Sequence, residues 1–287
     1  MNISLLGTGL LGAAVVERLI AQGYGAIVWN RTAAKSAALK SVGAACAHTA
    51  ADALQSCDIS LLFLSDRNAI EASVLNAETR AALLGRTVVN MGTISPDDSL
   101  ALFDAFAEAG AHYAECPVLG SLPEARSGTL ILMFGGSEAQ FSTLSPVLQA
   151  LGTSIKHIGK VGQAAALKLA MNQLIASETA AFTASLALVQ AHGVVVDDFM
   201  QLLRGSALYA PTFDKKLNRM LASDFSHPNF PLDHLIKDVR LFIASAKAQG
   251  IDTRPLAALE TVLAQVALNG HGQEDYSVLQ LGFKPTT

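Results

Sequence analysis

Hydrophobic positions follow different patterns in the two halves of the chain. In the first half, short apolar runs alternate with segments in which apolar residues recur every three or four positions. The runs predict buried strands and the segments between them predict helices, a combination typical of a parallel sheet covered by helices. The predicted strands are Ile3–Leu6, Ala26–Trp29, Ile59–Leu64, Thr87–Asn90, His112–Glu115, Thr129–Phe134 and Ser154–Ile158.

From about Val161 the apolar positions keep a helical period, and no convincing strand follows. One helical pattern covers 161–191 without a break, which at about 1.5 Å per residue predicts a helix roughly 45 Å long. We therefore expect an α/β fold, with a Rossmann-type doubly wound sheet over 1–160 and an all-α domain over 161–287 that begins with the long helix. Shorter helical patterns follow at about Asp197–Leu203, Thr212–Leu221, Leu232–Ala248 and Arg254–Leu268.

The long helical pattern is rich in alanine and apolar on more than one face. Such a helix packs against other helices, so we expect neighbours from its own domain and from a second subunit, in a homodimer or homotetramer. The chain as a whole is apolar for a soluble protein, with 51% hydrophobic and 15% charged residues. That composition is consistent with a surface covered by another subunit.

Charge and cysteine content exclude several classes of protein. The net charge of −4 argues against a nucleic-acid surface, because phosphate binding requires a basic footprint. The three cysteines show no CxxC spacing, so we expect no disulfide framework, no metal site and a reducing cytoplasm. No Lys or Arg precedes the first apolar run, and no stretch of about 18 uninterrupted apolar residues predicts a membrane span.

The first predicted strand is followed by a GxGxxG motif and then by a helical pattern, the order found where a sheet binds a dinucleotide. Gly7 allows the tight turn, Gly9 lets the backbone approach a pyrophosphate, and Gly12 lets the helix pack on the strand. The helix N-terminus offers free N–H groups and a positive dipole to the anion. The expected cofactor contacts in this turn are Gly7, Thr8, Gly9, Leu10, Leu11 and Gly12.

The end of the second strand carries the signal for cofactor preference. An acidic residue there would bind the ribose 2′-hydroxyl and repel a 2′-phosphate, but this chain has Asn30 and then Arg31. A guanidinium suits a phosphate, Thr32 adds a hydroxyl and Lys35 lies one turn further on. These residues predict NADP(H), although a solvated arginine that caps a loop would give the same sequence.

Further candidates follow the other strands, because ligands of doubly wound sheets bind outside the carboxyl ends of the strands. Leu64 ends the third predicted strand, Ser65 follows it and Thr93 comes after the fourth, so all three are expected to contact the cofactor. Lys168 and Asn172 lie four residues apart in the long helical pattern and therefore on one helical face. An ordinary amphipathic helix could carry the same pair.

Four ordered motifs resemble those of the β-hydroxyacid dehydrogenase family, which includes the 3-hydroxyisobutyrate and tartronate semialdehyde dehydrogenases. GTGLLG resembles the family's dinucleotide fingerprint, and CPVLGSLPEARSGTL resembles its substrate-binding segment, usually DAPVSGG followed by a GTL strand. GKVGQAAALKLAMNQ resembles the catalytic-helix motif, and IKDVRL resembles the KDL motif of a later helix. FPLDHLIKDVRL and GQEDYSVL further resemble the glyoxylate/succinic semialdehyde reductases, which use NADPH.

The resemblance implies hydride transfer between NADP(H) and a small semialdehyde or the corresponding hydroxyacid. By position, Lys168 would be the catalytic acid or base and Asn172 its substrate-orienting partner. Lys237 and Thr93 would contact the cofactor near its nicotinamide, although Lys237 could equally be a surface lysine paired with Asp233 one turn away. The substrate-binding positions would be Leu119, Gly120 and Ser121, the last two as donors to a carboxylate.

One departure from the family pattern concerns the substrate. Leu119 stands where many members have serine, Gly120-Ser121 replaces a Gly-Gly pair, and Glu115 opens the segment. A side-chain donor is therefore missing, and Leu119 favours a less polar acyl chain or a substrate without the usual carboxylate. Two other functions stay open: an imine reductase, which shares the architecture but commonly lacks the helix lysine, and a non-catalytic NADP(H)-binding protein.

Overall fold

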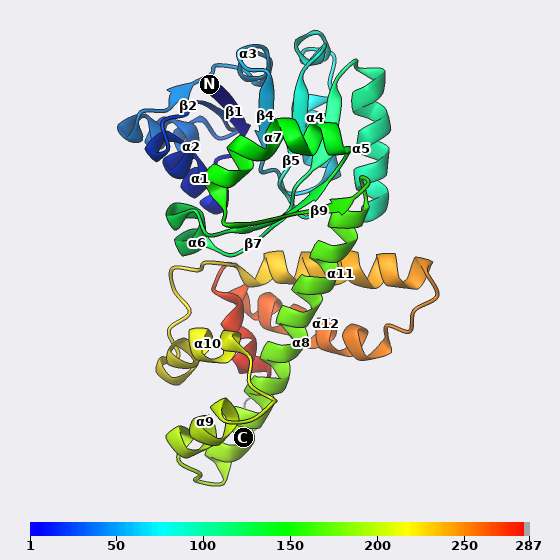
Figure 1. The fold of residues 1–287 in the computed structure, drawn as a ribbon. Helices are drawn as coiled ribbons and strands as arrows, with labels where there is room; N and C mark the ends of the chain where they lie inside the picture. The colour runs from blue at the N-terminus through cyan, green and yellow to red at the C-terminus, as the bar shows by residue number, and fades with distance from the viewer. Residues whose placement is uncertain (284–287) are drawn as a thin grey trace. The chain divides into compact units, whose positions relative to one another are not determined.

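The computed structural model describes residues 1–283 of the 287-residue chain. These residues form two compact units, 1–168 and 169 onward, and the division falls inside one continuous helix, α8 (Gln163–Ala191). The first unit contains the sheet and the second is helical (Figure 1). The expected fold class, a doubly wound sheet followed by an all-α region, is confirmed.

One nine-stranded sheet forms the centre of the first unit, in the order β3-β2-β1-β4-β5-β6-β8-β7, with β9 paired to β8. The six strands from β3 to β6 are parallel, and the chain reverses direction between β6 and β8. β1 lies between β2 and β4, where the strand order switches direction, so a ligand crevice is expected at its carboxyl end. The strands are β1 (Asn2–Leu6), β2 (Gly25–Trp29), β3 (Ala45–Cys46), β4 (Ile59–Leu62), β5 (Thr87–Asn90), β6 (His112–Glu115), β7 (Val118–Leu119), β8 (Ile131–Gly135) and β9 (Ser154–Gly159).

Helices cover both faces of this sheet (Figure 1). Successive strand residues point to opposite faces, so Leu5 packs in one core cluster and Leu6 in the other. Both faces are apolar because both are buried, as parallel sheets require. The first cluster includes α1 (Leu10–Ala21), α6 (Leu122–Ser127) and α7 (Glu138–Leu151), and the second includes α3 (Ala50–Gln55), α4 (Arg67–Val74) and α5 (Pro96–Glu108). The short helices α2 (Ala33–Ala37), η1 (Ala38–Val42) and η2 (Arg80–Leu83) complete the unit.

All seven predicted strands are present, and two more that the apolar pattern does not predict. β3 and β7 have two residues each, too few for a period to show. The segment 118–119, which the apolar pattern does not predict as a strand, pairs with β8, Val118 with Leu132 and Leu119 with Ile131. β4 ends two residues earlier than predicted, at Leu62, where the chain turns against the glycine turn after β1.

The second unit contains the predicted helices with small shifts at their ends. α8, α11 (Leu232–Ala248) and α12 (Arg254–Val266) pack with η4 (Tyr276–Phe283) around one apolar cluster. α9 (Val196–Arg204) and α10 (Pro211–Ala222) pack against the later part of α8 around a second cluster. α12 is two residues shorter than predicted, because a π-helical turn, η3 (Ala267–His271), follows it.

α8 is the one helix within residues 1–283 that is long and apolar enough to cross a membrane by length and composition alone. Its buried residues Ala176, Ala180, Phe182 and Leu186 belong to the two apolar clusters of the second unit. The core helix of a soluble protein passes the same test. The absence of a membrane span stays a prediction.

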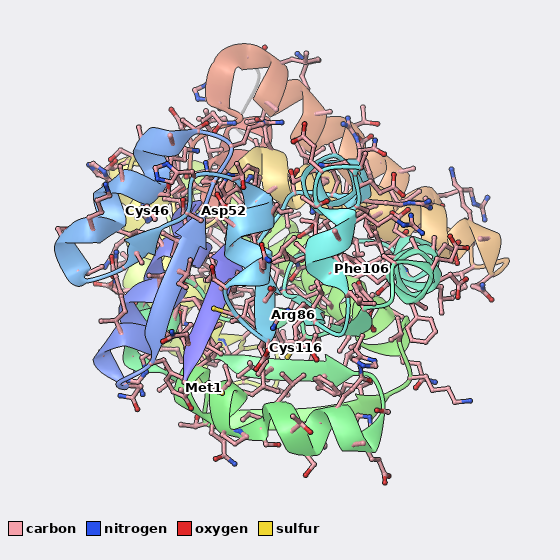
Figure 2. All side chains as sticks on the ribbon, turned by 90° about the horizontal axis from the view of Figure 1, so that it is seen from above. Met1, Cys46, Asp52, Arg86, Phe106 and Cys116 are labelled. Carbon is pink, nitrogen blue, oxygen red and sulfur yellow. The ribbon has the colours of Figure 1, made fainter. Side chains whose placement is uncertain are left out.

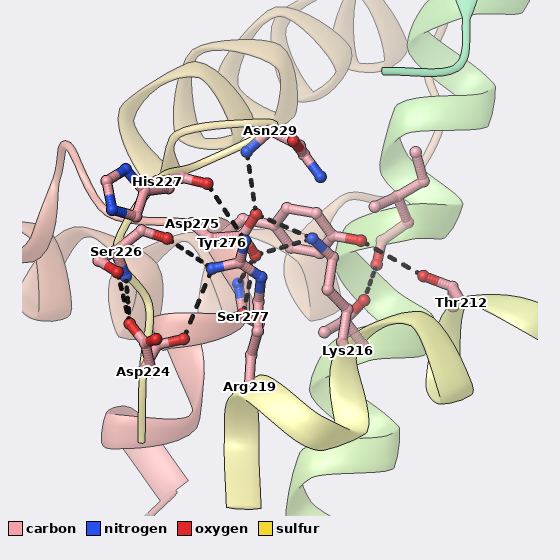
Figure 3. Close-up of polar contacts among 12 residues, drawn as sticks. Thr212, Lys216, Arg219, Asp224, Ser226, His227, Asn229, Asp275, Tyr276 and Ser277 are labelled. Atoms are coloured by element: carbon pink, nitrogen blue, oxygen red, sulfur yellow. Dashed lines mark hydrogen bonds and ion pairs between the residues drawn. The ribbon is translucent and has the colours of Figure 1, made fainter. Parts of the chain in front are cut away.

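A buried ion pair ties α10 to the residues that follow η3 (Figure 3). Lys216 Nζ lies 2.8 Å from Asp275 Oδ1 and 4.3 Å from the centroid of the Tyr276 ring. Asp275 also accepts hydrogen bonds from the Ser277 hydroxyl at 2.8 Å and from the Asn229 N–H at 3.4 Å. The charges are almost fully buried, so this hydrogen bonding compensates for their lost hydration.

The three cysteines are free and lie in different parts of the first unit. Cys46 lies in the edge strand β3 and Cys116 directly after β6 (Figure 2). Burial raises the pKa of the Cys57 and Cys116 thiols, so both stay protonated at neutral pH.

Candidate functional site

The turn after β1 has the backbone shape of a phosphate-binding loop. Gly7 has φ +101°, and a Cβ there would lie 2.2 Å from the carbonyl oxygen of Phe63. A Cβ on Gly12 would lie 2.1 Å from the carbonyl oxygen of Gly7, whereas Gly9 faces open space. Gly7 and Gly12 are thus required by close backbone contacts, and Gly9 leaves room for a ligand at the start of α1.

Thr8 provides a test of whether this turn fits a phosphate. Its N–H donates to Asn30 Oδ1 at 3.0 Å, while its buried hydroxyl has no hydrogen-bond partner among the described residues. Buried hydroxyl groups are nearly always hydrogen-bonded, so an unpartnered one indicates a missing partner. Together with the open space at Gly9 and a first helical turn without acidic residues, the turn fits an anionic pyrophosphate.

At the end of β2, Asn30 has a structural role that differs from that of the exposed residues after it. The Asn30 side chain accepts from Thr8 and donates to the Thr32 carbonyl at 3.1 Å, so it connects the strand end to the glycine turn. The side chains of Arg31, Thr32 and Lys35 are exposed beside it. Residues 30–40 contain no Asp or Glu. Asn30 therefore shapes this corner, and the side chains of Arg31, Thr32 and Lys35 are exposed to solvent beside it.

The turns after β1, β4 and β5 meet at one edge of the sheet. A Cβ on Gly7 would lie 3.1 Å from Leu64 Cδ2, and one on Gly92 would lie 2.6 Å from the Leu64 carbonyl oxygen. The Ser65 hydroxyl donates to Asp66, which caps α4. Half-buried Thr93 follows Gly92, so the predicted residues Leu64, Ser65 and Thr93 all lie at this edge.

In the predicted substrate segment, residues 119–121, the hydrogen-bond donors expected of Ser121 already have partners within the protein. Gly120 has φ +118°, and Ser121 caps the N-terminus of α6. Both the N–H and the hydroxyl of Ser121 donate to Glu124 Oε2, each at 2.8 Å, so a substrate carboxylate would compete with Glu124 for these donors. Leu119 pairs with Ile131 across the strands, which puts two large apolar side chains on one face.

Lys168 lies in the first turns of α8 and is 9% exposed. The start of this helix is fixed by Glu115, the last residue of β6. Glu115 Oε1 accepts from the backbone N–H groups of Gly162, Ala164 and Ala165 at 2.8, 2.9 and 3.1 Å. The lysine is thus held on a helix whose N-terminus is attached to the sheet.

Asn172, one turn beyond Lys168, belongs to the second unit and is buried there. Its amide donates to Asp238 Oδ2 at 2.6 Å, and Asp238 Oδ1 lies 3.1 Å from Lys237 Nζ. Asn172, Asp238 and Lys237 therefore form one polar group between α8 and α11. Lys237 also lines a pocket of about 640 Å³ at α11 and α12, together with Arg240 and Leu268.

Two family models match consecutive parts of the chain. Residues 2–159 match the NAD-binding domain of 6-phosphogluconate dehydrogenase, and residues 162–281 match the NAD-binding region of NADP-dependent 3-hydroxyisobutyrate dehydrogenase. A relative from Arabidopsis thaliana, glyoxylate/succinic semialdehyde reductase 1, is 30% identical over 97% of this chain and 97% of its own. The chain belongs to the β-hydroxyacid dehydrogenase family.

Solved structures with the same fold include other dehydrogenases and an imine reductase. The 3-hydroxyisobutyrate dehydrogenase of Mycobacterium tuberculosis has a TM-score of 0.88 at 21% identity, with 99% of each chain covered. An imine reductase from Myxococcus stipitatus, solved with NADP+, has a TM-score of 0.68 at 24% identity, covering 99% of this chain and 100% of its own. At these identities the likeness concerns the fold. Membership of the dehydrogenase family makes this chain an oxidoreductase with NAD(P)-binding domains.

Two residues of this β-hydroxyacid dehydrogenase gain a place in the site that the sequence analysis did not assign. Asp238 was visible as a charge beside Lys237, but its partner Asn172 lies 66 residues away. Glu115 was visible as an acid at the end of an apolar strand, and its partners lie 47–50 residues away. An acidic residue in a buried strand is the signal that could have indicated a buried partner.

Proposed function

We propose that this protein is an NADP(H)-dependent reductase of a small semialdehyde, resembling glyoxylate or succinic semialdehyde, or the dehydrogenase of the corresponding hydroxyacid. The observation that carries the proposal is the buried Lys168, one turn from Asn172, on a helix anchored to the sheet. A lysine held at such a place can serve as general acid or base. The similarity to the Arabidopsis reductase supports the choice of substrate class.

The residues of the site divide the chemistry among them. The glycine turn after β1 would hold the pyrophosphate. Arg31, Thr32 and Lys35 would hold the 2′-phosphate, and Thr93 would lie at the nicotinamide end. The bound cofactor supplies or accepts the hydride. In reduction, the Lys168 ammonium donates the proton to the carbonyl oxygen and stabilises its developing negative charge; in oxidation, the neutral amine accepts the proton of the hydroxyl.

Replacement of Lys168 tests this proposal. General acid–base catalysis contributes about 10²–10⁴-fold, so Lys168→Ala should lower kcat for succinic semialdehyde or glyoxylate by at least about 10²-fold. NADPH affinity, measured by fluorescence titration, should change little because the phosphate-binding residues are untouched. Lys160→Ala is the matched control, since Lys160 is an exposed lysine just before α8. Near-wild-type turnover by Lys168→Ala would refute the catalytic assignment.

An imine reductase is the second candidate, and the pair Leu119–Ile131 favours it. An apolar pair suits a hydrophobic substrate without a carboxylate, and the donors of Ser121 are already bonded to Glu124. NADPH oxidation with succinic semialdehyde or glyoxylate, measured beside a cyclic imine, separates the two functions. Turnover of the imine alone would replace the semialdehyde assignment. NADPH binding without turnover of any carbonyl or imine in the panel would indicate a non-catalytic protein.

A further inference from the structure

Glu115 is a buried carboxylate whose surroundings differ from those of an ordinary core residue. One of its oxygens accepts three backbone N–H groups from Gly162, Ala164 and Ala165, at the start of α8. Its other oxygen accepts a hydrogen bond from the Ser99 hydroxyl. The residue is 1% exposed, so it is shielded from solvent. The carboxylate therefore interacts with the positive end of the α8 dipole.

Glu115 and the start of α8 are held in place by different parts of the structure. Glu115 belongs to β6, where it pairs with Asn90 of β5 on one side and Gly135 of β8 on the other. It is thus fixed by hydrogen-bonded strands. Gly162, which precedes α8, has the left-handed conformation with φ +93°. Its N–H donates to Glu115 Oε1, so this oxygen links the start of the helix directly to the sheet.

Lys168 lies three and four residues after Ala165 and Ala164, which places it one turn above the anchored N–H groups. Helical side chains lean toward the N-terminus, over the preceding turn. The position of the lysine head therefore depends on where that turn is held. In catalysis a displacement of about 1 Å can cost about 10²-fold in rate.

Gly135 provides independent support for a built contact. A Cβ on Gly135 would lie 2.6 Å from Glu115 Oε1 and 2.8 Å from Glu115 Cγ. The β8 strand therefore leaves out a side chain where the carboxylate needs the space. An alanine at this position would push the carboxylate from its place without changing any charge.

We propose that Glu115 is a positioning residue: its carboxylate holds the first turn of α8 on the sheet and thereby sets the place of Lys168 for proton transfer. The inference rests on the proposed function of Lys168. Glu115 itself is buried beneath the helix and acts through α8.

Two substitutions separate the reach of the side chain from its charge. Glu115→Asp keeps the charge and shortens the reach by one methylene, and Glu115→Gln keeps the shape and removes the charge. We expect kcat for succinic semialdehyde to fall about 10- to 100-fold in Glu115→Asp and about tenfold in Glu115→Gln. The Kd of NADPH should stay within about twofold of the wild type. A loss of kcat without a loss of cofactor affinity indicates impaired proton transfer in a folded protein. Gly135→Ala should resemble Glu115→Asp.

Glu138→Gln is the matched control, because Glu138 also lies in the first turn of a helix, α7, but is exposed. Its kcat should equal that of the wild type. If kcat in both Glu115 variants stays within about threefold of the wild type, the positioning role is refuted. A loss of NADPH affinity that matches the loss of kcat would also refute it, since it would indicate unfolding of the whole unit.

Hydrogen exchange gives a readout that does not depend on turnover. The amides of Gly162, Ala164 and Ala165 should exchange at least about tenfold faster in Glu115→Asp than in the wild type, because they lose their acceptor. Unchanged exchange would refute the anchor. If the wild type turns over no semialdehyde, the proposed function fails while the exchange measurement still decides whether Glu115 holds α8.

Discussion

At the scale of single residues, Asn30 and Arg31 show how neighbours in sequence take different roles. Asn30 uses both ends of its amide inside the protein, with Thr8 and with the Thr32 carbonyl. Arg31 is exposed next to it. We therefore expect selection between the two nicotinamide cofactors to depend on Arg31 and its exposed neighbours.

Arg31→Ala should weaken NADPH binding about 10- to 100-fold, because a charge-assisted hydrogen bond to a phosphate contributes about 1.5–3 kcal/mol. NADH lacks the 2′-phosphate, so its Kd should change by less than about threefold. Titration of both cofactors against wild type and variant measures the difference. Lys40→Ala, at an exposed lysine nearby, serves as the control. Equal weakening of NADPH and NADH would contradict a 2′-phosphate contact.

The buried Glu115 carboxylate also makes stability depend on pH. Burial raises the pKa of Glu115, although hydrogen bonds from Ser99 and the α8 backbone oppose the change. The folded protein thus binds this proton more tightly than the unfolded chain, whose value is near 4.5. Protonation of Glu115 therefore contributes to the free energy of unfolding in full below the unfolded pKa of about 4.5. This contribution is lost as the pH rises through the higher pKa of the folded protein.

Glu115→Gln removes this dependence, so the Tm of the variant minus that of the wild type should increase from about pH 4 to about pH 7. Differential scanning calorimetry across this range measures it. Tyr113 and Cys116 are titratable neighbours of Glu115, and burial raises the pKa of both, so they stay neutral throughout. A Tm difference that is constant or falls with pH would contradict the assignment.

At the scale of elements, a buried ion pair connects segments that lie outside the regular helices to α10. The segment between α10 and α11 is held by Lys216 and Asp275, with Asn229 donating from its backbone (Figure 3). Burial alone would raise the pKa of Asp275, but the Lys216 ammonium and the Ser277 hydrogen bonds hold it below its usual value. The ion pair therefore acts as a fixed connection in the helical unit.

Lys216→Met should lower the free energy of unfolding by about 3–5 kcal/mol, because it leaves the Asp275 charge buried without its partner. Urea denaturation followed by circular dichroism measures the change. Lys216→Met combined with Asp275→Asn should recover part of the loss, since no charge is then buried. Lys215→Met, at the exposed neighbour, should change stability by less than about 0.5 kcal/mol. A loss below about 1 kcal/mol in Lys216→Met would contradict this account.

At the scale of the whole molecule, the helical unit exposes large apolar side chains that a monomer does not cover. Leu188 on α8 is 61% exposed, and Leu202 on α9 and Leu208 after it are each 77% exposed. Apolar surface of this kind marks interaction sites when it is contiguous. We keep the prediction that the protein is a homodimer or homotetramer built on the long helix.

Sedimentation equilibrium should give a particle of two or four chains of 30.0 kDa. Leu188→Glu should shift the population to smaller particles, because burying a charge at an apolar interface is costly. Leu84→Glu is the control, since Leu84 is 73% exposed but belongs to the sheet unit. A wild-type particle of one chain at micromolar concentration would contradict an oligomer.

The sequence by itself determined the elements that depend on local periodicity. Seven strands were predictable as short apolar runs, because strands of a parallel sheet are buried on both faces, and the long helix was predictable from its unbroken helical pattern. The glycine turn was predictable because its spacing follows from backbone sterics, which the positive φ of Gly7 and the close approach at Gly12 bear out. Ser95 caps α5 and Pro96 is its first residue, the positions that serine and proline favour at a helix start.

The tertiary structure alone decided which distant residues meet. No local pattern connects Glu115 with Gly162, Asn172 with Asp238 or Lys216 with Asp275, because each contact depends on how strands and helices are ordered in space. The two-residue strands β3 and β7 are strands by pairing alone. Periodicity tells whether a residue is buried, whereas topology decides its partner, and in this protein the partners of Glu115 place the helix that carries Lys168.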